Sequence, residues 1–460
     1  MANTSLFMLT LILWIICISR EAAGKCKKYA DQVLLVSMDG FRYDYPERAT
    51  TPNFDRMAQK GVKADYVTNV FPTKTFPSHY SAVTGLHTES HGIVGNTMYD
   101  PEFDEYFSMR THETKWWDRG EPLWITARKH GRSSGCMFWP GSEVEIQGLR
   151  PNRWYKYNES ITYDERVDIV MDMLKVDKLN FVTLYFHQPD LDGHIYGPSA
   201  TEIVEKVEEM DALLGTLLDK LDENGLVDKV NLIIMSDHGM TEIDYDNKLV
   251  EIYDLVNKSL IERTVDSGPI MHVVPIVGQE DAVLNAINSH PHFTAYRKAD
   301  IPDRLHYQNN RRIMPIFVMS DEGWSITWNR TWTRRYLSKG NHGYDNGLMS
   351  MKSIFYAMGP NFRQKYPASP FKSIDLYPLV CELLDMPPSD NNGTLANTKN
   401  FIKPFKNCDG TFRITSSKFY RLLSYSRKST VRNEGKMNYF FRHEFREMFS
   451  GKICNHFIQR

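Results

Sequence analysis

The sequence predicts an α/β fold with a mostly parallel central sheet flanked by helices. Three short, continuously apolar, β-rich runs are spread along the chain, at residues 33–36, 181–186 and 232–235. Apolar runs without polar alternation are typical of central strands that are buried on both faces of a parallel sheet. A strongly periodic helical segment separates the last two runs, as expected where helices alternate with parallel strands.

The helical segment is predicted from apolar residues that recur every three or four positions, and Asn224-Gly225 predicts its end. We therefore expect its Met210 to belong to the core rather than to a cofactor site. The apolar positions are Ile203, Val207, Met210, Leu214, Leu217 and Leu221. No low-complexity segment, fixed-period repeat or flexible linker interrupts residues 31–401, so a single catalytic domain over residues 25–405 is the economical interpretation.

The composition excludes disordered and fibrous classes of protein. Of the 460 residues, 42% are hydrophobic and 24% charged, which is ordinary for a globular chain with a large core. The net charge of −2 gives no electrostatic basis for holding polymeric nucleic acid, although a nucleotide-sized substrate stays open. The charge is uneven, because residues 411–460 contain 11 basic and 3 acidic side chains.

The two ends of the chain are expected to lie outside the catalytic domain. Residues 6–18 are almost entirely apolar and are followed by Ala22, Ala23 and Gly24, which predicts a signal peptide over residues 1–24. An uncleaved signal anchor is the alternative. Residues 406–460 form a basic tail, for which we expect either a solvated end or peripheral contact with an anionic membrane surface.

Cysteines and sequons fit an extracellular protein that is secreted or attached to the outer cell surface. With Cys17 in the signal peptide, five cysteines remain and allow at most two intramolecular disulfide bonds. Their pairing is not defined by the sequence. Four N-x-Ser/Thr sequons predict glycosylation at Asn158, Asn257, Asn329 and Asn392.

Acidic and imidazole side chains follow the predicted strands directly, where ligands of open α/β sheets gather. Two of them, Asp190 and His194, are four residues apart and would share one face of a helical turn. Gly239 is expected to allow the turn that brings its two preceding side chains to one ion. The six candidate metal ligands are Asp39, Asp190, His194, Asp237, His238 and His342.

Mixed carboxylate and imidazole donors favour zinc over magnesium or calcium, and six of them suffice for two ions. Two ions about 4 Å apart would hold the attacking and leaving oxygens of an in-line phosphoryl displacement. Each segment taken alone is equally compatible with a helix cap, a turn or a hydrogen-bonded loop.

Thr75 is the candidate nucleophile. Pro77 suits the first turn of a short helix that Gly85 ends, so free N–H groups are expected to face a phosphate beside Thr75. Metal coordination would lower the pKa of the hydroxyl and activate it. An ordinary helix N-cap is the alternative role.

Six segments, in order, closely resemble the ecto-nucleotide pyrophosphatase/phosphodiesterase family of the alkaline phosphatase superfamily, in a short form without flanking domains. The likeness covers about residues 32–400. The segments are LLVSMDGFR, FPTKTFPSHYSAVTGLHTESHGIVGN, FWPGSEVEI, PDLDGHIYGP, SDHGM and GNHGYDN.

The resemblance implies an alkaline-phosphatase-like core with two zinc ions. Thr75 would attack the α-phosphate and form a nucleotidyl-threonine intermediate, which water would then hydrolyse. One ion would be held by Asp190, His194 and His342, and the other by Asp39, Thr75, Asp237 and His238.

The resemblance also implies that Phe76 and Tyr157 sandwich the base, unless both are packing aromatics. Such stacking is worth on the order of 1–3 kcal/mol per base. Two positions depart from the family pattern. Ser78 stands where most members place an asparagine that binds a phosphoryl oxygen, and Gln188 replaces the usual acid before the Pro-Asp pair.

The leading prediction is an extracellular zinc-dependent phosphodiesterase/pyrophosphatase that hydrolyses ATP, ADP, dinucleoside polyphosphates and NAD to nucleoside 5′-monophosphates. One alternative is a choline-type phosphodiesterase of the same family that acts on glycerophospho- or sphingolipids. The other is a catalytically weak cell-surface binding protein with the same fold.

Overall fold

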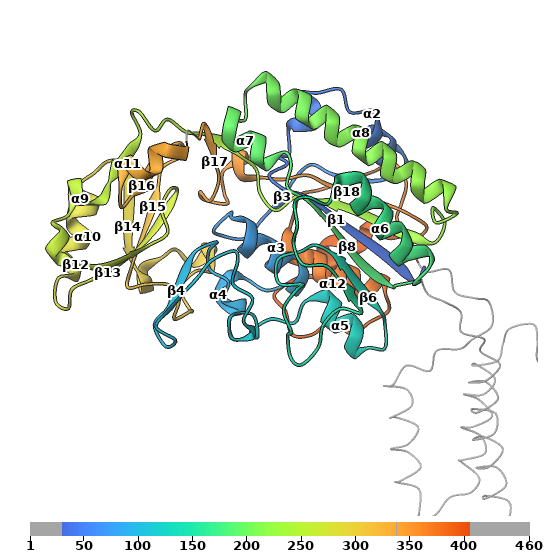
Figure 1. Ribbon diagram of the computed structural model, residues 1–460, viewed down its shortest axis with the longest axis horizontal. Helices are drawn as coiled ribbons and strands as arrows, with labels where there is room; N and C mark the ends of the chain where they lie inside the picture. The colour runs from blue at the N-terminus through green and yellow to red at the C-terminus, as the bar shows by residue number, and fades with distance from the viewer. Residues whose placement is uncertain (1–29, 337, 405–460) are drawn as a thin grey trace, which may run out of the picture. The chain divides into compact units, whose positions relative to one another are not determined.

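An eight-stranded sheet forms the centre of the structure (Figure 1). The computed structural model describes residues 30–336 and 338–404. The predicted signal peptide, residues 1–24, and the basic tail, residues 406–460, lie outside the described residues.

The central sheet has the strand order β19-β2-β18-β9-β1-β8-β6-β7. Strand β18 runs antiparallel to its neighbours β2 and β9, and every other neighbouring pair is parallel. The predicted mostly parallel sheet is thereby confirmed. The strands are β1 (Gln32–Met38), β2 (Gly61–Ala64), β6 (Ser134–Met137), β7 (Arg153–Trp154), β8 (Phe181–Phe186), β9 (Val230–Met235), β18 (Phe355–Met358) and β19 (Tyr366–Ala368).

The three predicted apolar runs form β1, β8 and β9, which are adjacent in the middle of the sheet. Alternate residues of β1 enter different apolar clusters. Val33 and Leu35 belong to one cluster, whereas Leu34 and Val36 belong to the other. Because both faces of the strand are buried, every position is apolar, and this is the reason for the continuous run.

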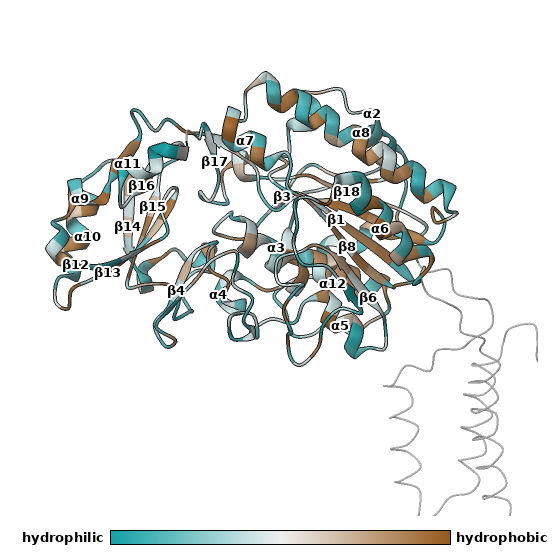
Figure 2. Ribbon diagram, in the orientation of Figure 1, coloured by the Kyte–Doolittle hydropathy of each residue, from teal (hydrophilic) through white to brown (hydrophobic). Residues whose placement is uncertain are grey.

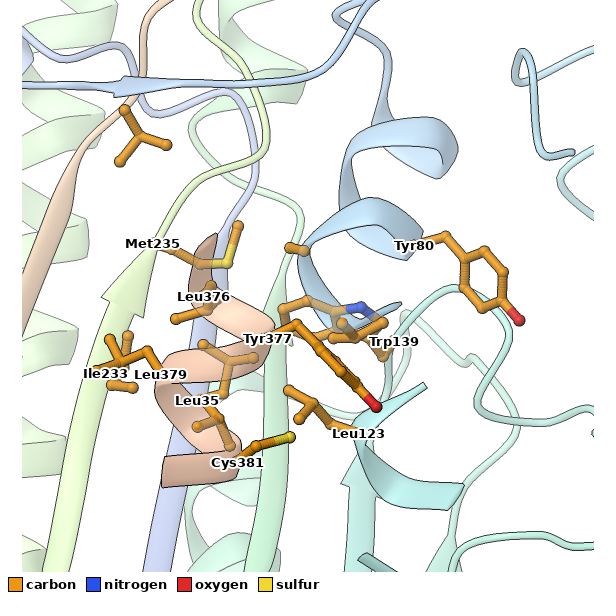
Figure 3. Close-up of a cluster of buried hydrophobic side chains, with 14 of the residues drawn as sticks. Leu35, Tyr80, Leu123, Trp139, Ile233, Met235, Leu376, Tyr377, Leu379 and Cys381 are labelled. Atoms are coloured by element: carbon orange, nitrogen blue, oxygen red, sulfur yellow. The ribbon is translucent and has the colours of Figure 1, made fainter. Parts of the chain in front are cut away.

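Helices cover both faces of the sheet. Figure 3 shows Leu376, Leu379 and Cys381 of one covering helix beside Leu35 of β1 and Ile233 of β9. That face is covered by α3 (Thr75–Thr84), α5 (Leu123–Lys129) and α12 (Leu376–Leu383), and the opposite face by α2 (Pro52–Lys60), α6 (Tyr163–Lys175) and α8 (Thr201–Glu223).

Helix α8 is the predicted periodic helix. Asn224 is its C-cap residue, and Gly225 follows with a φ of +63°, so the predicted end is confirmed. Met210 is 1% exposed and belongs to the core, as expected. Figure 2 shows hydrophobic and hydrophilic residues on different sides of this helix, whose apolar side faces the sheet.

A second, four-stranded antiparallel sheet was not predicted. Its order is β12-β13-β15-β14, and it has an apolar cluster of its own with α9 (Ile252–Leu255) and α10 (Glu280–Asn288). Only part of each outer strand is buried, so the sequence shows no continuous apolar run there. The strands are β12 (Ile261–Val265), β13 (Ile270–Pro275), β14 (Phe293–Arg297) and β15 (Ile316–Ser320).

The described chain also contains short strand pairs and short helices. The pairs are β3 (Val67–Thr68) with β20 (Phe371–Lys372), β4 (Met98–Asp100) with β5 (Glu105–Phe107), β10 (Thr241–Glu242) with β17 (Gly340–Asn341), and β11 (Leu249–Glu251) with β16 (Ser325–Thr327). The short helices are α4 (Thr88–His91), α7 (Asp190–Tyr196), α11 (Arg330–Thr333) and α13 (Leu395–Thr398).

Two of the five cysteines expected in the mature chain are described. Cys136 and Cys381 are buried and unpaired. Cys26, Cys408 and Cys454 lie outside the described residues, so disulfide formation stays a prediction. Within residues 30–336 and 338–404, no helix is long and apolar enough to cross a bilayer.

Candidate metal centre

Three neighbouring strands bring five of the six candidate ligands to one edge of the central sheet, and the sixth, His342, follows β17. Asp39 follows β1, Asp237 and His238 follow β9, and α7 follows β8. Because β9, β1 and β8 are adjacent and parallel, their carboxyl ends meet at this edge. The structure brings the six predicted ligands into two groups, in each of which the ligand atoms lie within 4.8 Å of one another. The groups are Asp39, Asp237 and His238, and Asp190, His194 and His342.

In the first group, each carboxylate uses one oxygen on the protein and leaves the other unpaired. Tyr185 Oη donates to Asp39 Oδ2 at 2.7 Å, and the Gly40 N–H donates to Asp237 Oδ1 at 3.1 Å. Asp39 Oδ1 and Asp237 Oδ2 are buried without a hydrogen-bond partner, and they lie 3.3 and 3.0 Å from His238 Nε2. Buried carboxylate oxygens without partners are costly, so this group fits a bound cation.

All three imidazoles are oriented in the same way. In each ring Nδ1 lies 2.8 Å from a backbone carbonyl oxygen, so Nδ1–H donates and the lone pair of Nε2 stays available for a metal. The carbonyls are those of Gly239, Gly340 and Thr73 for His238, His194 and His342.

The second group contains the predicted helical pair. Asp190 and His194 both lie in α7, and His194 Nε2 is 3.5 Å from Asp190 Oδ2. His342 Nε2 is 3.6 Å from Asp190 Oδ1, which is buried without a hydrogen-bond partner. The His342 ring stacks on that of His238 with 3.4 Å between centroids, so the two groups are in contact.

Two glycines permit this convergence through close approach. A Cβ on Gly40, whose φ is +65°, would lie 2.7 Å from Asp190 Cα, and the Asp190 N–H donates to Asp39 O at 3.0 Å. Gly239 was expected to permit a turn, but its φ is not in the left-handed region. It is needed because a Cβ there would lie 2.0 Å from Ser350 O.

Burial and neighbouring charges set the pKa values of the two carboxyl groups in the first group. Burial, then the charges of Asp237 and Asp190, raise the pKa of Asp39 well above its usual range. Burial also acts to raise the pKa of Asp237, but His238 and His79 outweigh it and lower that pKa. A cation would relieve the repulsion between these carboxylates.

Thr75 is the first residue of α3 and is not its N-cap, because Lys74 occupies that position. Its Oγ1 lies 3.4 Å from His238 Nε2, the imidazole atom that the first group leaves for a ligand. Pro77 lies in the first turn and Gly85 ends the helix with a φ of +67°, as predicted. The hydroxyl therefore lies at the border of the first metal group.

Free backbone N–H groups were expected in the first turn of α3, but two of them have partners within the protein. The Phe76 N–H donates to Asn96 Oδ1 at 2.9 Å, and the Ser78 N–H to Lys74 O at 3.0 Å, so neither is available to a phosphate. Asn96 was not singled out from the sequence, where only its place in a family-like segment pointed to it. Ser78 is fully buried with its hydroxyl unpartnered, and its contact with a phosphoryl oxygen stays a prediction.

His79, one helical turn after Thr75, was also missed. Its Nδ1 lies 2.8 Å from Thr75 O and 3.3 Å from Asp237 Oδ2, and its Nε2 lies 2.8 Å from Ser37 Oγ. Trp139 is buried and donates from Nε1 to His79 O at 3.0 Å. This buried imidazole therefore links Thr75 to the first group.

The two predicted base-stacking aromatics differ in exposure. Phe76 is partly buried and packs against Trp117, with ring centroids 5.9 Å apart. Tyr157 is 39% exposed, and its ring lies 5.1 Å from that of Phe138 and 6.0 Å from that of Tyr185. Their role in holding a base stays a prediction.

The four sequon asparagines lie at the surface of the described chain. Three are exposed and Asn329 is half-buried, with its Oδ1 accepting a hydrogen bond from the Trp332 N–H at 2.8 Å. Their glycosylation stays a prediction. The other three are Asn158, Asn257 and Asn392.

Comparison with known proteins gives consistent matches. Residues 33–345 match the family described as type I phosphodiesterase/nucleotide pyrophosphatase. The chain is 41% identical over 371 residues to the bis(5′-adenosyl)-triphosphatase of Xenopus laevis, covering 80% of this chain and 81% of that protein. It is 39% identical over 376 residues to ectonucleotide pyrophosphatase/phosphodiesterase family member 5 of Homo sapiens, covering 81% and 78%.

A solved structure agrees with these matches. An inactive variant of the murine ectonucleotide pyrophosphatase/phosphodiesterase 5, in complex with AMP, aligns with a TM-score of 0.78 and 38% identity. The alignment covers 81% of this chain and 100% of the murine one.

Proposed function

This chain belongs to the type I phosphodiesterase/nucleotide pyrophosphatase family of hydrolases. From that premise we propose that it is an extracellular, zinc-dependent enzyme that hydrolyses nucleotides. Its proposed substrates are ATP, ADP, dinucleoside polyphosphates and NAD, and its product is a nucleoside 5′-monophosphate. The name of the Xenopus relative, which is a dinucleoside triphosphatase, and the AMP bound to the murine relative support this substrate class.

Zinc is the metal that the donor set favours. Each group combines imidazole nitrogen with carboxylate oxygen, as zinc sites do, and each contains a buried carboxylate oxygen without a partner. When bound, two zinc ions supply Lewis-acid polarisation of the phosphoryl oxygens and lower the pKa of a coordinated hydroxyl. One ion is assigned to Asp190, His194 and His342, and the other to Asp39, Thr75, Asp237 and His238.

Thr75 acts as the nucleophile of a two-step displacement. Its Oγ1 forms a bond to the α-phosphorus as the bond to the leaving group breaks, which gives a nucleotidyl-threonine. Water then cleaves the bond between Thr75 and phosphorus, releases the nucleoside 5′-monophosphate and restores the hydroxyl. Phe76 and Tyr157 hold the base on its aromatic faces.

The single observation that carries this proposal is the pair of unpartnered carboxylate oxygens, Asp39 Oδ1 and Asp237 Oδ2, beside a hydroxyl at the start of a helix. Two buried carboxyl groups that face one imidazole nitrogen favour a bound cation, and the nearby Thr75 hydroxyl supports the proposal that this residue is one of its ligands.

A substrate panel tests the proposal. Purified protein with zinc should hydrolyse p-nitrophenyl thymidine monophosphate much faster than p-nitrophenyl phosphorylcholine, and should release AMP from ATP and from dinucleoside polyphosphates. Chelation should abolish both reactions, and added zinc should restore them. A preference for the choline ester would establish the lipid phosphodiesterase instead, and bound zinc without turnover would establish a binding protein.

Localisation outside the cell is part of the same proposal. It is supported by the name of the human relative, an ectonucleotide pyrophosphatase/phosphodiesterase. The full chain, expressed in cultured cells, should appear in the medium or at the outer surface. Activity confined to the cell interior would contradict it.

A further inference from the structure

Helix α7 depends on its surroundings for its orientation. It has only seven residues, yet it carries Asp190 and His194 of the second group. Short helices are not stable by themselves in water, so contacts from other segments must hold this one. Its start is held by the hydrogen bond from the Asp190 N–H to Asp39 O, and its end by that from the Lys339 N–H to His194 O at 2.8 Å.

The first turn of α7 lacks an ordinary cap, and Gln188 supplies one. The N-cap residue is Pro189, which makes no side-chain cap. Gln188 is 8% exposed, and its Oε1 accepts a hydrogen bond from the Asp192 N–H at 3.2 Å while its Nε2 donates to Asp192 Oδ1 at 2.8 Å. An N–H can only donate and an ionised carboxylate can only accept, so the orientation of the amide is unambiguous.

The structure assigns to Gln188 the role of a positioning residue: with Asp192 it forms a matched donor and acceptor pair that holds α7 in place for the second metal group. This inference rests on the proposed function, because it concerns the same metal site. Asp192 Oδ2 extends the pair to Lys206 Nζ of α8 at 3.6 Å, so α7 is also tied to the long helix that covers the sheet.

A glutamate at position 188 would conflict with this pair. An acid there would place a second carboxylate against Asp192 Oδ1, at the distance now occupied by a charge-assisted hydrogen bond. Two like charges in contact at a buried position repel each other and would push the first turn of α7, and Asp190 with it, away from the site. The amide removes that conflict and adds a donor.

Replacing the amide by an acid, and then the acid by an amide, tests the pair. Gln188→Glu should retain zinc about 10–100-fold less tightly, the usual effect of losing a residue that orients a metal ligand, and should lower kcat at saturating zinc more than it changes KM. The double variant Gln188→Glu/Asp192→Asn reverses donor and acceptor in the side-chain hydrogen bond and keeps an acceptor for the backbone N–H of residue 192. It should recover both quantities to within about threefold of the unaltered protein.

Gln279→Glu is the matched control, because it makes the same change at the start of another helix, α10, and should alter neither quantity. Zinc retention is measured by competition with a chromophoric chelator. Hydrogen exchange of the Asp192 and Gly193 amides reports the position of α7 without reference to metal or substrate.

Wild-type zinc retention and kcat in Gln188→Glu would overturn the inference, as would a double variant as weak as the single one. If the unaltered protein neither retains zinc nor hydrolyses nucleotides, the proposed function fails by itself. Hydrogen exchange then still tests the pair, because Gln188→Glu must accelerate exchange of the α7 amides and the double variant must slow it again.

Discussion

Tyr185 donates a hydrogen bond to one oxygen of Asp39, and the Gly40 N–H donates to one oxygen of Asp237. The second oxygen of each carboxylate has no hydrogen-bond partner. The three imidazoles repeat this division, with Nδ1 bound to backbone and Nε2 directed to the site. At the scale of single residues, the protein therefore fixes each ligand through one atom and offers the other, which is how neighbouring groups orient metal ligands.

Replacing Thr75 by Ala should remove turnover and leave nucleotide binding. The variant loses the attacking oxygen but keeps the six metal-binding side chains, so hydrolysis of p-nitrophenyl thymidine monophosphate should fall on the order of 10³-fold or more. Binding of AMP, measured by calorimetry with zinc present, should stay within a few-fold. Thr294→Ala, on an exposed position of β14, is the control, and near-normal turnover in Thr75→Ala would exclude the nucleophile role.

Tyr157→Ala should weaken substrate binding without slowing chemistry. Loss of one stacking face is worth about 1–3 kcal/mol, so KM for nucleotides should rise roughly 5- to 150-fold while kcat changes little. Tyr157→Phe keeps the ring and should behave like the unaltered protein. Steady-state kinetics on ATP will decide, and an unchanged KM in the alanine variant would show that this tyrosine is a packing aromatic.

At the scale of elements, one ion pair joins the start of α3 to the end of a strand of the antiparallel sheet. Lys74, the N-cap residue of α3, lies 2.5 Å from Asp266, which follows β12. The two side chains are only 8% and 10% exposed. The position of Thr75 thus depends on two sheets, and not on α3 alone.

Breaking this ion pair should destabilise the folded protein. Asp266→Asn leaves the Lys74 ammonium buried without a counter-charge, which should lower the free energy of unfolding by about 3–5 kcal/mol. Asp219→Asn breaks the surface pair with Arg56 and should cost at most about 1 kcal/mol. Urea unfolding measures both, and equal small effects would show that the Lys74–Asp266 pair is not effectively buried.

At the scale of the whole molecule, a buried carboxylate connects segments that are far apart in the sequence. Asp100 at the end of β4 accepts hydrogen bonds from Arg311 Nε at 2.8 Å and from Arg312 Nε at 2.7 Å, shortly before β15. Burial acts to raise the pKa of Asp100, but the two arginines outweigh it and lower that pKa to about 2.

Acid should therefore weaken the fold through this group. An aspartate has a pKa of about 3.9 when the chain is unfolded, so ionised Asp100 contributes its full stabilisation above about pH 4. That contribution is lost as the pH falls through the folded value near 2. Thermal unfolding between pH 5 and 2 should show a shallower decline for Asp100→Asn than for the unaltered protein, whereas Asp164→Asn, an exposed control, should follow the unaltered curve.

Sequence patterns predicted those parts of the fold whose signal is local. The strands β1, β8 and β9 are buried on both faces and so appear as continuous apolar runs, and α8 shows its apolar side at helical spacing. The antiparallel sheet was missed because strands such as β12 are buried at only some positions. His79 and Asn96 were missed because their partners, Asp237 and the Phe76 N–H, come near them only after folding.

By itself, the sequence determined the α/β class, the six candidate ligands and the threonine beside them, because strand ends, helical spacing and motifs are properties of neighbouring residues. The tertiary structure decided which ligands share a group, which of their oxygens lack partners, and that Gln188 binds Asp192. The ligand groups depend on distances between segments up to about 200 residues apart, and such distances exist only when the strands lie side by side in the sheet. Gln188 and Asp192 are only four residues apart, and their hydrogen bonds depend on how the chain folds at the start of α7.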